Sequence, residues 1–124
     1  METNVTVILG GSWVNKFDRI NWRGEIEQMC QKKKFEKLRG EVGLWLVGEY
    51  KAKKLNQEYR RRSYVPQVLT FPTKNREPDM DGIFRVGDVV ICGPLLIKEA
   101  KCNKIDVKLV AREWLEHGFS NLEF

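Results

Sequence analysis

Histidine and cysteine, the side chains that most often hold transition metals, are scarce in this sequence. His117 is the only histidine among 124 residues, and the three cysteines form no C-x-x-C pair. Three is an odd number, and Cys30, Cys92 and Cys102 each lie in an apolar or helical stretch. The pattern predicts buried, reduced thiols in a cytoplasmic protein rather than a disulfide framework.

Long apolar segments are also lacking. No apolar run approaches the roughly 20 residues that a membrane span needs. Residues 1–6 carry no basic run, and residues 5–9 are too short for the apolar region of a signal peptide. We find no phosphate-binding loop, nucleophile elbow or dinucleotide fingerprint. These absences predict a soluble, cytoplasmic protein without a membrane partner.

The composition is that of one globular domain with an excess of basic residues. Hydrophobic residues make up 42% and charged residues 31% of the chain, so a core is expected rather than disorder. The length suits a single domain over residues 1–124. The net charge of +5 and the isoelectric point near 9.2 favour an anionic partner, first of all a nucleic acid.

Hydrophobic patterning predicts an α+β fold, with about four strands in one mixed sheet and about four helices. Apolar runs bounded by glycine or proline predict the strands, and apolar residues at helical spacing predict the helices. The expected order is β-α-β-α-β-β-α-α. Strands are expected at 5–9, 41–47, 68–71 and 84–92, and helices from about 22 to 34, 49 to 62, 96 to 103 and 107 to 118.

Several helix details follow from single residues. In the second helix Ala52, Leu55 and Tyr59 are expected on one apolar face. Asp106 is the expected cap of the last helix, and Gly118 is the expected stop.

The acidic cluster of Glu77, Asp79 and Asp81 matches no metal-ligand loop, so we interpret it as part of a solvated loop.

Three segments resemble the bacterial YbeY family. Residues 55–60 read L-N-Q-E-Y-R, which matches the family's L-N-x-x-Y-R. Residues 65–72 read V-P-Q-V-L-T-F-P and resemble its P-T-D-V-L-S-F-P. Residues 87–92 read G-D-V-V-I-C, followed by I-K-E-A at 97–100, and match G-D-I-V-I-C and the helix after it. The resemblance covers roughly residues 41–118 and implies a YbeY-like fold for the whole chain.

The resemblance also implies a zinc site, because the family carries H-G-x-L-H-L-x-G-x-D-H. Aligned at His117, this chain reads H-G-F-S-N-L, so Asn121 occupies the position of the second histidine ligand. The domain is expected to lack the C-terminal part of this motif and to keep one of three histidine ligands. Two alternatives remain open for His117: a zinc ligand, with Glu113 one turn earlier, or a packed residue that continues the apolar face of Val110 and Trp114.

Arg60 matches the arginine of L-N-x-x-Y-R, which in the family faces the active-site groove and contacts RNA phosphate. Arg61 and Arg62 extend the basic stretch and are further RNA-binding candidates. Tyr59 and Tyr64 are nearby platforms for base stacking, unless Tyr59 belongs to the core.

By this resemblance the chain is expected to be an rRNA maturation factor that acts on or binds single-stranded or ribosomal RNA. The family is a zinc-dependent endoribonuclease, and this chain is expected to have impaired or absent nuclease activity. The expected partners are the rRNA of the small ribosomal subunit and ribosome-assembly proteins. The alternative is a non-catalytic protein-interaction domain whose basic charge is incidental.

Overall fold

The chain forms a four-stranded mixed sheet with helices on both faces. The computed structural model describes residues 5–32, 39–73, 80 and 82–122. In chain order the elements are β1 (Val5–Gly10), a 3-10 turn η1 (Val14–Phe17), α1 (Trp22–Lys32), β2 (Arg39–Val47), α2 (Glu49–Arg60), β3 (Val68–Pro72), β4 (Ile83–Cys92), α3 (Gly93–Asn103) and α4 (Val107–Ser120). The predicted α+β class and the order of strands and α-helices are confirmed. The turn η1 was not predicted.

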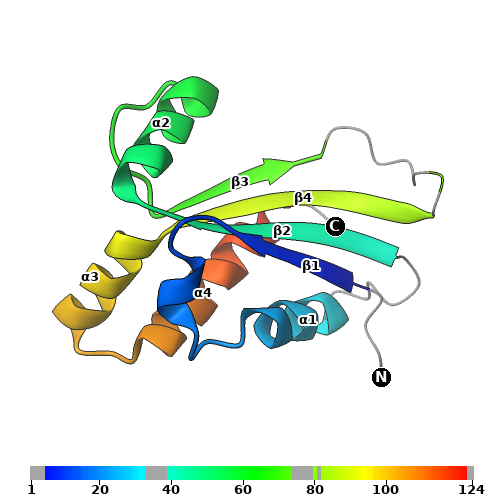
Figure 1. The fold of residues 1–124 in the computed structure, drawn as a ribbon, viewed down its shortest axis with the longest axis horizontal. Coiled ribbons are helices and arrows are strands. Elements are labelled where there is room, and N and C mark those ends of the chain that lie inside the picture. Colours follow the sequence, from blue (N-terminus) through cyan, green and yellow to red (C-terminus); the bar gives the residue numbers. More distant parts are fainter. Residues whose placement is uncertain (1–4, 33–38, 74–79, 81, 123–124) are drawn as a thin grey trace.

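The strand order is β1-β2-β4-β3. β1 pairs with β2 and β2 with β4 in parallel, whereas β3 pairs antiparallel with β4 at the edge. Helices α1, α3 and α4 lie on one face of the sheet, and α2 lies on the opposite side near β3 (Figure 1). Of the described helices, three therefore cover the first face of the sheet, whereas a single helix lies over the other face.

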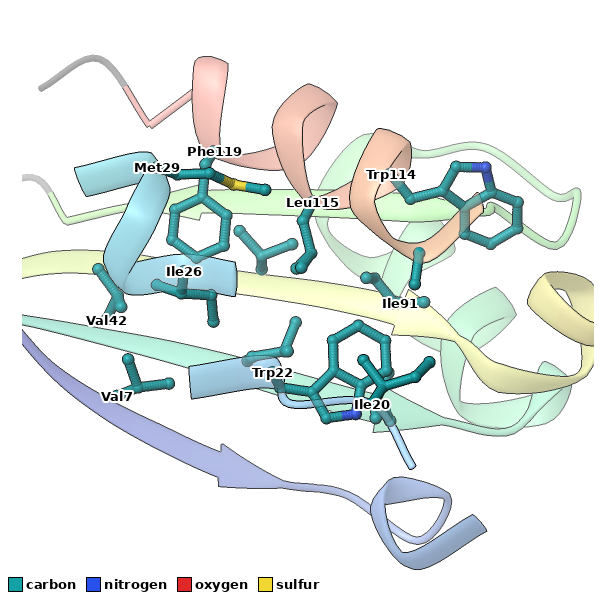
Figure 2. Packing of buried hydrophobic residues seen from close by; sticks show 14 of the residues in the cluster. Val7, Ile20, Trp22, Ile26, Met29, Val42, Ile91, Trp114, Leu115 and Phe119 are labelled. Carbon is teal, nitrogen blue, oxygen red and sulfur yellow. The ribbon is translucent and has the colours of Figure 1, made fainter. Parts of the chain in front are cut away.

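The main core lies between the sheet and the three helices on its first face. Val7, Val42 and Ile91 point from the strands toward Ile26 of α1 and Leu115 of α4 (Figure 2). Burying one such aliphatic side chain contributes about 1.5–3 kcal/mol. Most of the apolar residues that the sequence pattern identified as helical lie in this cluster, including Trp22, Met29, Val110 and Trp114.

The opposite face of the sheet carries only a small apolar cluster, which lies under α2. Its buried members include Val47, Ala52, Leu69 and Val90. Tyr59 lies on the same side of α2 as Leu55, as predicted, and its ring contacts Phe71. The residue is 66% exposed, so the alternative that it belongs to the core is wrong. One helix above the edge of a sheet buries only a narrow stripe, and here that stripe is Ala52 and Asn56.

Two helix ends differ from their predictions. α3 begins at Gly93, with Pro94 in its first turn, where the missing N–H of proline costs no hydrogen bond. α4 does not stop at Gly118 but continues to Ser120. A Cβ atom at Gly118 would lie 2.7 Å from Cγ1 of Val89, so this glycine lets the helix approach the sheet closely. The predicted cap is confirmed, since Asp106 Oδ1 accepts a hydrogen bond from the backbone N–H of Lys108 at 2.9 Å.

Three further predictions, on the cysteines, the acidic cluster and membrane spans, have different outcomes. Cys30 and Cys92 are buried as predicted, but Cys102 is exposed on the solvent side of α3. The acidic residues Glu77, Asp79 and Asp81 lie outside the described residues. Within the described parts of the chain, every helix is too short or too polar to cross a bilayer.

Candidate nucleic-acid interface

A groove runs between the C-terminal end of α2, the edge strand β3 and the C-terminal half of α4. It consists of two adjoining hollows of about 610 and 280 Å³ that share Arg60, Val68 and His117. We call it the α2–α4 groove. Its remaining lining residues are Tyr64, Val65, Pro66, Gln67, Leu69, Thr70, Pro72, Glu113, Trp114 and Asn121. The groove thus brings together Arg60, His117 and Asn121, which are up to 61 positions apart in the sequence.

Arg60 is the last residue of α2, and its exposed side chain lies at the wall of the groove. The helix ends because Arg61 adopts a left-handed conformation, with φ of 56°. The backbone N–H of Arg61 donates to the carbonyl oxygen of Gln57, and the N–H of Arg62 donates to that of Asn56. Among the described residues no carboxylate forms an ion pair with Arg60, so its guanidinium remains available to an anion.

His117 and Asn121 are held at the end of α4 by its contact with β3. Thr70 Oγ1 donates a hydrogen bond of 2.9 Å to the carbonyl oxygen of Gly118, and Ser120 Oγ donates one of 2.8 Å to that of His117. Both His117 and Asn121 are exposed to the groove. The alternative that His117 packs in the apolar face of α4 is therefore wrong. That face consists of Val110, Ala111, Trp114, Leu115, Gly118 and Phe119.

The donor set of the groove does not fit a zinc ion. Such a site takes three or four imidazole, thiolate or carboxylate ligands. The described residues offer the imidazole of His117 and the carboxylate of Glu113, which both line the groove. The carboxamide of Asn121 is a weak zinc ligand beside these. Within the described residues no three His, Cys, Asp or Glu side chains are grouped for metal binding.

Arg61 and Arg62, the other RNA-binding candidates, are exposed at the turn after α2. Neither side chain lines the groove. Tyr64 lies in the same turn and does line the groove, and the residue is 54% exposed. Arg60 and Tyr64 thus face the groove together, whereas the role of Arg61 and Arg62 stays a prediction.

Two residues that shape the groove were missed from the sequence. Asn56 is completely buried in α2, and its Nδ2 donates a hydrogen bond of 3.0 Å to the carbonyl oxygen of Tyr64. Thr70 ties β3 to α4. The available signal for Asn56 was its position four residues after Ala52, which places both on one helix face. Nothing local distinguishes Thr70 from a solvent-facing threonine of an edge strand.

Comparison with known proteins identifies relatives over most of the chain. The family model described as Endoribonuclease YbeY matches residues 12–122. The Endoribonuclease YbeY of Bordetella pertussis is 44% identical over 61 residues, which are 49% of this chain and 36% of the relative. That of Methylobacillus flagellatus is 32% identical over 82 residues, covering 66% of this chain and 51% of the relative.

The protein of the same name from Mesoplasma florum is 32% identical over 97 residues, covering 72% of this chain and 55% of the relative. The chain therefore spans between about a third and about half of the length of these curated relatives. A Thermotoga maritima protein whose structure was determined in solution has the same fold, with a TM-score of 0.63 at 22% identity. This match covers 94% of the chain and 71% of the Thermotoga protein, and at that identity it concerns the fold alone.

Proposed function

The chain belongs to the YbeY family, and on this premise we propose that it binds single-stranded RNA in the α2–α4 groove. Arg60 contacts a backbone phosphate, because a guanidinium offers paired N–H donors that match two phosphate oxygens. The RNA class that we propose is the rRNA of the small ribosomal subunit, in keeping with the family, and ribosome-assembly proteins are proposed as further partners.

One observation supports this proposal above the others. Arg60, from the family's L-N-x-x-Y-R segment, lines the same groove as His117 and Asn121 from its metal-motif segment. The two segments belong to different helices, and the packing of α4 against β3 brings them together. The net charge of +5 adds a long-range attraction to an anionic strand.

We propose binding without efficient cleavage for this chain. The donor set described above does not fit a zinc ion, so no step of the proposal passes through one. The groove itself needs only its shape, Arg60 and the positive charge around it to hold a strand.

The test is a binding measurement on the purified chain with a fluorescein-labelled, single-stranded 12-nucleotide RNA at several salt concentrations. We expect affinity to fall with salt, with a logarithmic slope of about −0.7 for each phosphate contacted. The Arg60→Ala variant should bind about tenfold more weakly, the size of a charge-assisted hydrogen bond, with a shallower salt slope.

The matched control is Lys98→Ala, which also removes one positive charge from an exposed helical position but lies outside the groove. Its affinity should stay close to that of the wild type. Equal weakening in both variants would mean that net charge alone attracts RNA, and absence of binding at low salt would refute the proposed function. Incubation of the same RNA with added zinc measures cleavage; a wild-type rate above that of Arg60→Ala would overturn the proposal of binding without cleavage.

A further inference from the structure

Another hollow, of about 480 Å³, lies on the α2 face of the sheet, apart from the α2–α4 groove. We call it the aromatic hollow. It is lined by Trp45, Val47, Lys51, Leu55, Tyr59, Phe71, Asp88 and Val90. Three of these side chains are aliphatic, three are aromatic, one is cationic and one is anionic. None of these lining residues is shared with the groove.

The indole of Trp45 lies against a glycine of β1 and one of its own strand β2, and a carboxylate of β4 accepts its hydrogen bond. Its Nε1 donates a hydrogen bond of 3.0 Å to Asp88 Oδ1 of β4. A Cβ atom at Gly10 would lie 2.3 Å from the indole ring, and one at Gly43 would lie 2.9 Å from its Nε1. The indole therefore occupies space above two glycines on adjacent strands. It is a fixed surface, and its residue is still 37% exposed.

Tyr59 and Phe71 form the other aromatic part of the hollow. Their rings meet edge to face, with centroids 5.1 Å apart. Phe71 comes from β3 and Tyr59 from the last turn of α2. Because Tyr59 is 66% exposed, its ring has free surface beside its contact with Phe71.

The aromatic hollow adjoins the groove across the edge strand. Tyr59 lines the hollow, and the next residue, Arg60, lines the groove. At the end of β3, Phe71 lines the hollow, whereas its neighbours Thr70 and Pro72 line the groove. An RNA strand that passes over the C-terminal end of α2 therefore has access to both the aromatic hollow and the groove.

We propose that the aromatic hollow binds an unpaired base of the same RNA strand, and this rests on the proposed function. Trp45 supplies the stacking surface. Asp88 accepts a hydrogen bond from an exocyclic amino group, which cytosine and adenine have and uracil lacks. Lys51 contacts a phosphate of the bound strand. Aromatic platforms beside basic residues are the usual means of holding single-stranded nucleic acid, and the positive net charge favours this occupant over a basic peptide.

The experiment compares Trp45→Ala with wild type on two labelled RNA probes, a 12-nucleotide oligocytidine and the same backbone with abasic ribose at every position. Loss of one stacked base weakens binding by about tenfold or more. We expect this loss on oligocytidine and no difference on the abasic probe. Tyr50→Ala is the matched control, because Tyr50 is an exposed aromatic residue at the start of α2 and lies outside the hollow. It should bind like wild type.

A second measurement does not depend on the folding of Trp45→Ala. Wild type should bind oligocytidine more tightly than oligouridine, and Tyr59→Ala, at an exposed position, should weaken binding of oligocytidine. If Trp45→Ala and Tyr59→Ala both match wild type while Arg60→Ala binds weakly, the base site is refuted and the groove proposal stands. If wild type binds no RNA, both fail. A protein partner that is captured after nuclease treatment and lost in Trp45→Ala, without any effect on RNA, would also overturn the base site.

Discussion

At the scale of single residues, the close approach of α4 to the sheet depends on Gly118. The space for a side chain there is already taken by methyl groups of Val89 and Val68, 2.7 and 3.1 Å from an added Cβ atom. Val89 is completely buried in the main core, so it has little room to move. Gly118 therefore controls the position of the end of α4, which carries His117 and Asn121.

We expect Gly118→Ala to lower the free energy of unfolding by up to about 2 kcal/mol, because overpacking costs about 1–3 kcal/mol and the better helix propensity of alanine returns about 1 kcal/mol. Urea unfolding measures this difference. Glu116→Ala, on the exposed face of the same helix, is the control and should change stability little. A Gly118→Ala variant more stable than wild type would show that the helix shifts freely.

The three cysteines provide a test of burial at this scale. Cys30 and Cys92 are 1% exposed, whereas Cys102 is exposed. Burial also raises the pKa of the Cys92 thiol, which further lowers its thiolate fraction. In native protein we expect one thiol to react rapidly with a disulfide reagent and all three to react in denaturant. The fast reaction should disappear in Cys102→Ser, and its persistence would contradict the described burial.

At the scale of elements, α1 and α4 are joined by one ion pair with two hydrogen bonds. Arg112 Nε and Nη2 donate to the two carboxylate oxygens of Glu25, each at 2.9 Å. The hydrogen bonds from Arg112 lower the pKa of Glu25 below its ordinary value of 4.5. The pair therefore stabilises the folded state above pH 4.5, and this contribution is lost as the pH falls through the lowered pKa.

Replacing Arg112 with alanine should reduce stability modestly near pH 7, and the difference from wild type should shrink as the pH is lowered below about 4.5, the ordinary pKa of the carboxyl. Thermal unfolding at a series of pH values measures this. Arg112→Ala also removes packing by the arginine stem, so Glu25→Gln is the companion variant. A stability difference that does not change between pH 7 and pH 3 would exclude the ion pair as its cause.

The turn after α2 depends on the side chain of Asn56. Its Nδ2 is bonded to the carbonyl oxygen of Tyr64, a residue of the groove wall. We expect Asn56→Ala to cost about 1–3 kcal/mol, since a buried hydrogen bond is lost. RNA affinity should fall as well, because Tyr64 and Arg60 are no longer fixed relative to each other.

Gln57→Ala, the adjacent exposed position, is the control for both measurements. Unfolding in urea gives the stability difference, and titration with the labelled RNA gives the affinity. An Asn56→Ala variant with wild-type affinity under conditions where it is fully folded would show that the turn does not need this bond to form the groove.

At the scale of the whole molecule, the sequence predicts the elements better than their arrangement. Local apolar periodicity identifies every strand and α-helix among the described residues, because it reports burial within a few residues. The order β1-β2-β4-β3 depends on parallel pairing between distant segments, and no local pattern encodes it. The exposure of Tyr59 and the wrong stop at Gly118 have the same origin, since both depend on what packs against the helix.

For the candidate site, too, the sequence predicts single residues better than their arrangement. Short motifs identify Arg60, His117 and Asn121, whereas their meeting in one groove requires the contact of α4 with β3. Of the residues that line the aromatic hollow, only Tyr59 was predicted to contact RNA, as a platform for base stacking. Trp45 and Asp88 lie 43 positions apart on paired strands, where Asp88 is opposite Gly43, two residues before Trp45. Both read as ordinary strand residues in the sequence.

The central place of α4 in the core has a consequence for synthesis of the protein. Chains leave the ribosome from the N-terminus, and domains fold largely as units. The helix that covers the sheet with Leu115 and Phe119 is the last element of the described chain to emerge. Until then the apolar faces of α1 and of the parallel strands have no complete cover. The nascent chain therefore exposes its future core until α4 has emerged, and in this period it is most open to capture by chaperones.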